Sequence, residues 1–108
     1  MKYTIYHNPR CRKSREGLDY LKSKGHEVEI IEYLKSPLTI SELENLVELL
    51  GIEPQYLVRT NEIIWKENFK GRDHSQKQIL SILANNPKLI ERPVISNGST
   101  AIVGRPLE

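Results

Sequence analysis

Apolar and polar positions along the first third of the chain predict a strand, a helix and a second strand. Residues 2–6 are rich in aromatic and β-branched side chains and run into an Asn-Pro pair, which is typical of a short strand that enters a loop. A helix is expected to open at Cys11 and to stop at Gly25, because its apolar side chains recur at helical spacing. Residues 26–33 again have strand composition, so this part predicts a β-α-β unit with two parallel strands.

The middle of the chain is interpreted as a group of helices. Thr39 with Glu42, and Ser75 with Gln78, each match the capping box, in which side chain and backbone groups satisfy each other at a helix start. Apolar stripes at helical spacing follow both boxes. Pro54 favours a further short helix, since proline is common at the first helical position. Two aromatic residues between these helices are interpreted as packing residues, namely Trp65 and Phe69.

The end of the sequence predicts a β-hairpin. Residues 93–95 and 100–103 have strand composition, and the Asn97-Gly98 dipeptide between them is preferred in tight hairpin turns. The order β-α-β, helices, β-hairpin matches a thioredoxin-like α/β fold with a mixed sheet. In such folds another helix usually follows the hairpin, whereas this sequence ends at Glu108, so we expect that final helix to be missing.

The composition is that of an ordinary globular protein. Hydrophobic residues make up 38% and charged residues 28% of the 108 positions, and we expect one domain over residues 1–108. Neither an apolar signal segment nor a run of membrane-spanning length occurs in the sequence. A cytoplasmic location without a membrane partner is therefore expected.

The net charge of +2 is unevenly distributed. It is +5 over residues 1–26, −6 over 27–67 and +3 over 68–108, so the two basic ends can converge on one anionic ligand. We do not expect nucleic acid as the partner, because no long Lys/Arg tract with interleaved aromatic residues occurs.

Cys11 is the only cysteine of the sequence and the candidate nucleophile. A lone cysteine excludes an internal disulfide and fits a reducing compartment, in which the thiol stays available for reaction. A free thiol has a pKa of about 8.5, which a helix N-terminus and nearby cations lower to roughly 3.5–7.5. The alternative is a buried structural thiol, but the expected loop-to-helix junction favours a reactive one. Four cationic side chains flank Cys11, at Arg10, Arg12, Lys13 and Arg15.

Three known thiol or metal patterns do not fit this stretch. A Cys-x5-Arg phosphatase loop fails because position 17 is glycine, and a Cys-x-x-Cys redox pair fails because position 14 is serine. His7 and Cys11 would need two more ligands to hold a metal, and the other two histidines show no ligand spacing. We therefore expect neither a metal nor a bound cofactor.

Residues 6–15 read Tyr-His-Asn-Pro-x-Cys-x-x-Ser-Arg and resemble the signature of the glutaredoxin-coupled, ArsC-like arsenate reductases. The resemblance implies a thioredoxin-like fold with a helical insertion and a cis peptide bond before Pro93, facing Cys11. It covers essentially the whole chain, because it continues through residues 32–37, 49–51, 57–59, 86–93 and 104–106.

The resemblance also implies roles for the site residues. Cys11 is the nucleophile and His7 helps to keep it ionised. From helix geometry alone, Arg15, one turn beyond Cys11, is better placed toward the thiol than Arg12 and is a further catalytic candidate. Three arginines bind the arsenic oxyanion, and guanidinium groups suit such an anion because they donate paired hydrogen bonds and stay charged. These arginines are Arg59, Arg92 and Arg105.

The implied reaction converts arsenate to arsenite. The Cys11 thiolate attacks arsenate and forms a thiol-arsenate adduct, which an outside thiol must resolve because the sequence contains no second cysteine. The resemblance implies glutathione or a similar small thiol as co-substrate, and glutaredoxin as the partner that clears the mixed disulfide.

Two other functions fit the same fold. A regulator of the Spx type binds RNA polymerase, but such regulators commonly carry a Cys-x-x-Cys switch and need not preserve the three arginines. A monothiol, glutaredoxin-like disulfide exchanger needs only Cys-x-x-Ser, which leaves the arginines unexplained.

Overall fold

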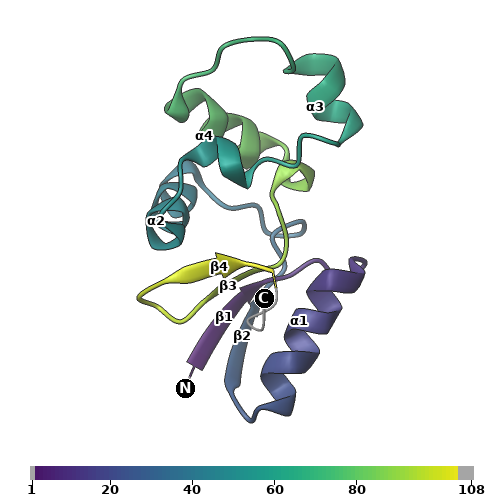
Figure 1. Ribbon diagram of the computed structural model, residues 1–108, viewed down its shortest axis with the longest axis vertical. Helices are drawn as coiled ribbons and strands as arrows, with labels where there is room; N and C mark the ends of the chain where they lie inside the picture. The colour runs from purple at the N-terminus through teal and green to yellow at the C-terminus, as the bar shows by residue number, and fades with distance from the viewer. Residues whose placement is uncertain (1, 105–108) are drawn as a thin grey trace.

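A computed structural model describes residues 2–104 and folds them into a four-stranded sheet with helices on both faces (Figure 1). The expectation of a missing final helix concerns positions outside this range. No helix among residues 2–104 is both long and apolar enough to cross a membrane. Along the chain the elements are β1 (Lys2–Tyr6), α1 (Arg12–Ser23), β2 (Glu27–Ile31), α2 (Ile40–Leu50), η1 (Pro54–Leu57), α3 (Ile63–Asn68), α4 (Gln76–Asn85), η2 (Pro87–Leu89), β3 (Val94–Ser96) and β4 (Ala101–Val103).

The sheet combines parallel and antiparallel strands. Its order is β2-β1-β3-β4, with β1 parallel to β2 and antiparallel to β3, and with β3 antiparallel to β4. The predicted mixed sheet is confirmed, and α1 makes the expected crossover between the two parallel strands. The predicted turn joins β3 to β4, where the Asn97 N–H donates to the Thr100 carbonyl at 3.1 Å and Gly98 has a φ of 95°.

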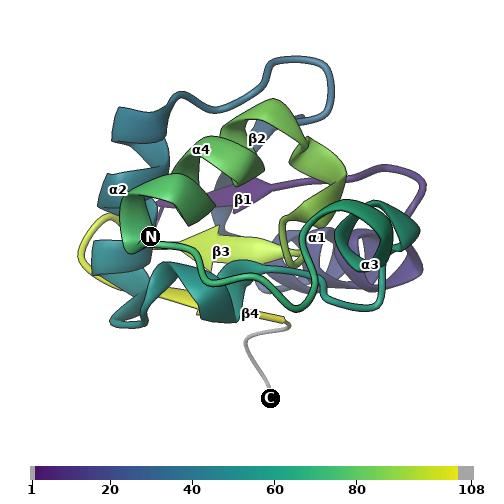
Figure 2. The same ribbon diagram turned by 90° about the horizontal axis from the view of Figure 1, so that it is seen from above.

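Alternate residues of the central strands pack into two separate apolar layers. Ile5 and Ile95 are register partners on β1 and β3, and they pack with Leu21 of α1 on one face of the sheet. The next pair in the register, Tyr6 and Val94, belongs to the layer on the opposite face, which α2 and α4 cover. Figures 1 and 2 show α1 on one side of the sheet and the group of α2, α3 and α4 on the other.

Helix α1 approaches the sheet closely at Gly17. A Cβ atom at this position would lie 3.2 Å from Pro93 Cγ and 3.5 Å from Ile95 Cδ1, and the first of these distances is tighter than an ordinary contact. Glycine therefore permits the close packing at this point. The contact joins α1 to the segment before β3, whose Arg92–Pro93 peptide bond is cis.

Both predicted capping boxes are present. The Glu42 N–H donates to Thr39 Oγ1 at 3.1 Å and the Thr39 N–H donates to Glu42 Oε1 at 3.0 Å, while the corresponding Ser75 and Gln78 distances are 3.1 Å and 2.7 Å. A cap of this kind stabilises a helix by about 1 kcal/mol. Helix α3 begins at Ile63 without a side-chain cap, and no sequence pattern predicted it.

An isolated antiparallel bridge joins residues 57–59 to residues 89–91. Two backbone hydrogen bonds flank it, one from the Arg59 N–H at 2.7 Å and one from the Glu91 N–H at 2.8 Å. The bridge thereby joins the segment of Arg59 to that of Glu91, which lies far later in the sequence and forms an ion pair with Arg59.

Candidate active site

Cys11 stands at the N-terminus of α1, directly before the first helical residue. Its backbone is extended, with φ −94° and ψ 123°, and its side chain makes no capping hydrogen bond. The Cys11 N–H donates to the Asn8 carbonyl at 2.9 Å, and the Cys11 carbonyl accepts the Arg15 N–H at 3.0 Å. The thiol therefore lies at the helix end where N–H groups lack partners within the helix and where the helix dipole is positive.

The surroundings of Cys11 favour the thiolate. Burial is the largest single influence and raises the pKa of the thiol, but hydrogen-bond donors and a positive charge outweigh it. The donors are the backbone N–H of Ser14, the guanidinium of Arg92, which also supplies the charge, and the backbone N–H of Lys13. The pKa of Cys11 is lowered from its ordinary value as a result, in the direction expected for a thiol at a helix N-terminus.

His7 is buried against Ser14, which lies one helical turn beyond Cys11. His7 Nδ1 and Ser14 Oγ are 2.6 Å apart, and the same hydroxyl oxygen accepts the Asn8 N–H at 3.0 Å. Burial lowers the pKa of His7, which favours the uncharged imidazole at neutral pH. The predicted role of His7 in keeping Cys11 ionised would therefore act through Ser14, whose backbone N–H lowers the pKa of the thiol, and not through a positive charge.

Replacing Ser14 by alanine is expected to lower the free energy of unfolding by about 2 kcal/mol, because the buried His7 ring and the partly buried Asn8 N–H lose their partner. Urea unfolding measures the change. Ser23→Ala is the matched control, because the Ser23 hydroxyl donates to a carbonyl on the exposed side of the same helix, and its effect should stay within about 0.5 kcal/mol. Equal stability of the Ser14 variant and the native protein would contradict a structural role for this hydroxyl.

Arg15 lies against the loop that precedes α1. Its Nη1 atom donates to the Pro9 carbonyl at 2.9 Å, and in the same loop the Arg10 N–H donates to Asn8 Oδ1 at 3.0 Å. The structure thus gives Arg15 a position that supports the loop shape around Cys11. Its catalytic role stays a prediction.

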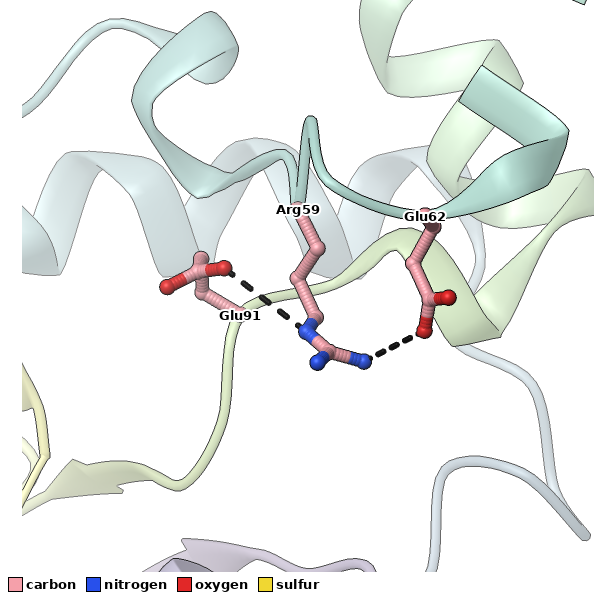
Figure 3. A network of polar contacts seen from close by, with 3 residues as sticks. All are labelled: Arg59, Glu62 and Glu91. Atoms are coloured by element: carbon pink, nitrogen blue, oxygen red, sulfur yellow. Dashed lines mark hydrogen bonds and ion pairs between the residues drawn. The ribbon is translucent and has the colours of Figure 1, made fainter. Parts of the chain in front are cut away.

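Arg59 is held between two carboxylates (Figure 3). Its Nη1 atom donates to Glu62 Oε1 at 2.6 Å, and its Nε atom lies 3.8 Å from Glu91 Oε1. Its side chain is only 28% exposed, so these ion pairs are less screened by water than an ordinary surface pair. The remaining nitrogen, Nη2, has no hydrogen bond or ion pair with any residue of the described part of the chain, which leaves it free for a ligand.

Arg92 lies in the segment before β3 and lines the same cleft as Cys11. It lowers the pKa of the thiol, and its buried Nε atom has no hydrogen-bond partner among residues 2–104. A buried donor without a partner is unfavourable, so this group is suited to an anionic ligand. Arg105, the third predicted oxyanion ligand, lies outside the described residues.

One cleft brings the nucleophile and two predicted oxyanion ligands together. Its volume is about 1060 Å³, and Cys11, Arg59 and Arg92 all line it. Trp65, which the sequence indicated only as a packing residue, also lines the cleft. Arg12 and Lys13 of the 6–15 stretch and Glu91 also line the cleft, together with three polar residues that no motif indicated, namely Arg72, Asp73 and His74.

Tyr33 is a buried core residue close enough to Cys11 and Arg92 to interact with their charges, and the sequence reasoning gave it no role. Its side chain is 1% exposed, and burial raises the pKa of its hydroxyl to about 12, with smaller opposing effects of the Arg92 and Cys11 charges. Tyr33 thus keeps its proton at neutral pH near the thiol and the guanidinium. The sequence did offer one indication of a role for Tyr33, because this residue lies just after β2 in the stretch 32–37, which is part of the family resemblance.

The fold and the site define a class of protein. A thioredoxin-like mixed sheet carries a thiol at the N-terminus of its first helix, and guanidinium groups from later segments share its cleft. Within residues 2–104, no group of three His, Cys, Asp or Glu side chains is arranged to hold a metal ion. The chain belongs to the ArsC family, whose model matches residues 6–108.

Similar proteins include several arsenate reductases. The chain is 38% identical to the arsenate reductase of Haemophilus influenzae, over 100% of this chain and 95% of that protein. It is 41% identical to the uncharacterized protein YfgD of Escherichia coli, over 96% of this chain and 89% of that protein. Among solved structures, the arsenate reductase from Vibrio cholerae matches with a TM-score of 0.92 and 38% identity, covering 98% of this chain and 92% of that one. The thioredoxin-like fold and the family resemblance are confirmed.

Proposed function

We propose that this protein is an arsenate reductase that takes its electrons from an external thiol. The observation that carries the proposal is that Cys11, Arg59 and Arg92 line one cleft, in which the guanidinium of Arg92 lowers the pKa of the thiol. Such a site suits a tetrahedral oxyanion, because the cations bind its charge while the thiolate attacks its central atom. The similarity to proteins described as arsenate reductases supports arsenate as that oxyanion.

Substrate binding is assigned to the arginines. Arg92 offers the buried Nε donor and Arg59 the unpaired Nη2 atom, while the family resemblance adds Arg105 as a third ligand. Charge-assisted hydrogen bonds of this kind each contribute about 1.5–3 kcal/mol. Arg92 contacts both the thiol and the ligand in this proposal, so it would bring the two reacting atoms together.

In the first chemical step the Cys11 thiolate attacks arsenic. A sulfur–arsenic bond forms, and one arsenate oxygen takes up protons and leaves as water, while arsenic remains in the +5 state. The lowered pKa of Cys11 provides the thiolate that this step needs. Because the step only exchanges a ligand on arsenic, the electrons must enter afterwards.

In the second step an external thiolate attacks the Cys11 sulfur. A disulfide bond forms, the sulfur–arsenic bond breaks, and its electron pair stays on arsenic, which leaves as arsenite in the +3 state. A second thiol then displaces Cys11 from the mixed disulfide, so two thiols become one disulfide for each arsenate reduced. The thiols must come from outside the chain, because the 108-residue sequence has a single cysteine. From the family resemblance we assign the first thiol to glutathione or a similar small thiol and the displacement of Cys11 from the mixed disulfide to glutaredoxin, in the cytoplasm.

Arsenate-dependent oxidation of glutathione in the presence of glutaredoxin tests the proposal. The expected result is a rate that requires the protein, arsenate and glutaredoxin together, measured as disulfide formed per unit time. A rate no higher than that of the protein-free mixture would refute it. Thiol–disulfide exchange that runs equally well without arsenate would instead indicate a monothiol disulfide exchanger.

Glu62→Gln is expected to strengthen arsenate binding by about 2- to 5-fold, because it releases Arg59 from its nearest carboxylate. The measured quantity is the arsenate concentration that halves the rate of Cys11 alkylation by iodoacetamide. Glu67→Gln on the exposed side of α3 removes the same charge without contacting Arg59, and should leave that concentration unchanged. Weaker binding by the Glu62 variant would contradict this expectation and assign the carboxylate to positioning Arg59.

A further inference from the structure

The cleft around Cys11 is much larger than one oxyanion. Its volume is about 1060 Å³, whereas a tetrahedral oxyanion is comparable to a few water molecules, each of which takes about 30 Å³ of liquid. Clefts of roughly 300–1,000 Å³ are those that hold whole organic ligands. The site therefore has room for a second, organic molecule beside the oxyanion.

One part of the cleft wall comes from the segment that follows α3. Trp65 and His74 line the cleft and have ring centroids 5.7 Å apart, and Phe69 packs against both at 5.7 Å and 6.0 Å. His74 Nε2 is also 3.0 Å from the Phe69 carbonyl oxygen. These contacts hold both ends of residues 70–73 in place, so Arg72 and Asp73 are presented to the cleft from a supported loop.

The charges of this wall are not used by the rest of the protein. Arg59 forms ion pairs with two carboxylates, and Arg92 lowers the pKa of Cys11. In contrast, Arg72 makes no ion pair or hydrogen bond with another residue of the range 2–104. Asp73 beside it likewise has no cationic partner within that range. A wall with one unpaired guanidinium and one unpaired carboxylate matches a ligand that carries both carboxylate and ammonium groups.

We infer that the wall of Arg72 and Asp73 binds the thiol co-substrate through the carboxylate and ammonium groups that a peptide thiol such as glutathione carries. The inference rests on the proposed function, which requires an external thiol at Cys11. Arg72 binds a carboxylate of the thiol and Asp73 its ammonium group, so that the sulfur is directed toward Cys11 in the same cleft.

A thiol–disulfide exchange without arsenate tests this site. The Cys11 thiolate attacks one sulfur of an added disulfide, the disulfide bond breaks, and a mixed disulfide with Cys11 forms as a thiolate leaves. Glutathione disulfide carries the charged groups, and bis(2-hydroxyethyl) disulfide lacks them. The readout is the rate at which each disulfide modifies Cys11, followed by mass spectrometry.

Arg72→Ala is expected to slow the reaction with glutathione disulfide by about 2- to 5-fold and to leave the neutral disulfide unaffected. Arg72→Lys, which keeps the charge, should retain most of the rate. Lys70→Ala removes an exposed cation of the same loop that does not line the cleft, and should change neither rate. The preference should also shrink at high salt, because the contact is partly exposed.

Equal losses with both disulfides, or no loss with either, would overturn the assignment. Since the assay contains no arsenate, its result is separate from that of the arsenate assay. A protein that reduces arsenate but shows no effect of Arg72→Ala refutes this inference alone, and a protein that prefers glutathione disulfide but does not reduce arsenate refutes the proposed function alone.

Discussion

Replacing Cys11 by serine is expected to abolish arsenate-dependent thiol oxidation, with a loss on the order of 10³-fold or more. The hydroxyl keeps the size of the thiol but does not ionise near neutral pH, so it cannot attack arsenic or form the mixed disulfide. The pKa of Cys11 is lowered by donors that would act on a hydroxyl too weakly to ionise it. The measurement is the rate of disulfide formation with glutathione and glutaredoxin supplied.

The same substitution should not weaken the fold. Cys11 occupies the N-cap of α1 without a capping hydrogen bond, and serine is among the preferred residues at such a position. We therefore expect the Cys11→Ser variant to unfold at the same urea concentration as the native protein or a higher one. A lost activity together with unchanged unfolding would assign the loss to chemistry, whereas an unchanged turnover rate would refute Cys11 as the nucleophile.

Arg92→Ala is expected to raise the pKa of Cys11 and to weaken arsenate binding by about 10- to 100-fold. Arg92 acts on the thiolate both as a hydrogen-bond donor and as a positive charge, so its loss removes two influences that lower the pKa. The thiolate fraction at pH 7 falls as a result. The loss of binding follows from one or two charge-assisted hydrogen bonds, each of about 1.5–3 kcal/mol.

The rate of Cys11 alkylation as a function of pH, with and without arsenate, separates the two effects of Arg92. The midpoint without arsenate gives the pKa, and the protection by arsenate gives the affinity. Lys88→Ala is the matched control, because it removes an exposed cation from the preceding 3-10 helix and should change neither quantity. If the pH midpoint of Cys11 alkylation is unchanged in the Arg92 variant, Arg92 does not act on the thiol. If arsenate protects Cys11 from alkylation equally well in the variant, Arg92 does not bind arsenate and its role is structural.

Local chemistry made much of the fold predictable. The capping boxes at Thr39 and Ser75 and the turn at Asn97-Gly98 involve groups no more than a few positions apart, so their residue types suffice to indicate them. Helix α3 was not predicted, since it lacks a cap. Its residue Trp65 makes aromatic contacts with Phe69 and His74, which follow the helix.

The candidate site was predictable only in part. The position of Cys11 at the start of a helix could be inferred, because it depends on the neighbouring loop and the apolar spacing that follows. The contact of His7 with Ser14 and the position of Tyr33 near the thiol could not, because each depends on how β1, β2 and α1 pack together. Arg59, Arg92 and Arg105 were named from the family resemblance and remain predicted ligands.

The sequence by itself determined the order of the strands and of every α-helix except α3, and the place of a lone thiol at a helix N-terminus, because these follow from hydrogen bonds and apolar periodicity over short distances. Only the tertiary structure decided which charges meet that thiol. The bridge between residues 57–59 and 89–91 brings Arg59 beside Glu91, and the packing of α1 against Pro93 brings Arg92 into the cleft of Cys11. Such long-range contacts carry no local signature, because they arise from the closure of the whole fold.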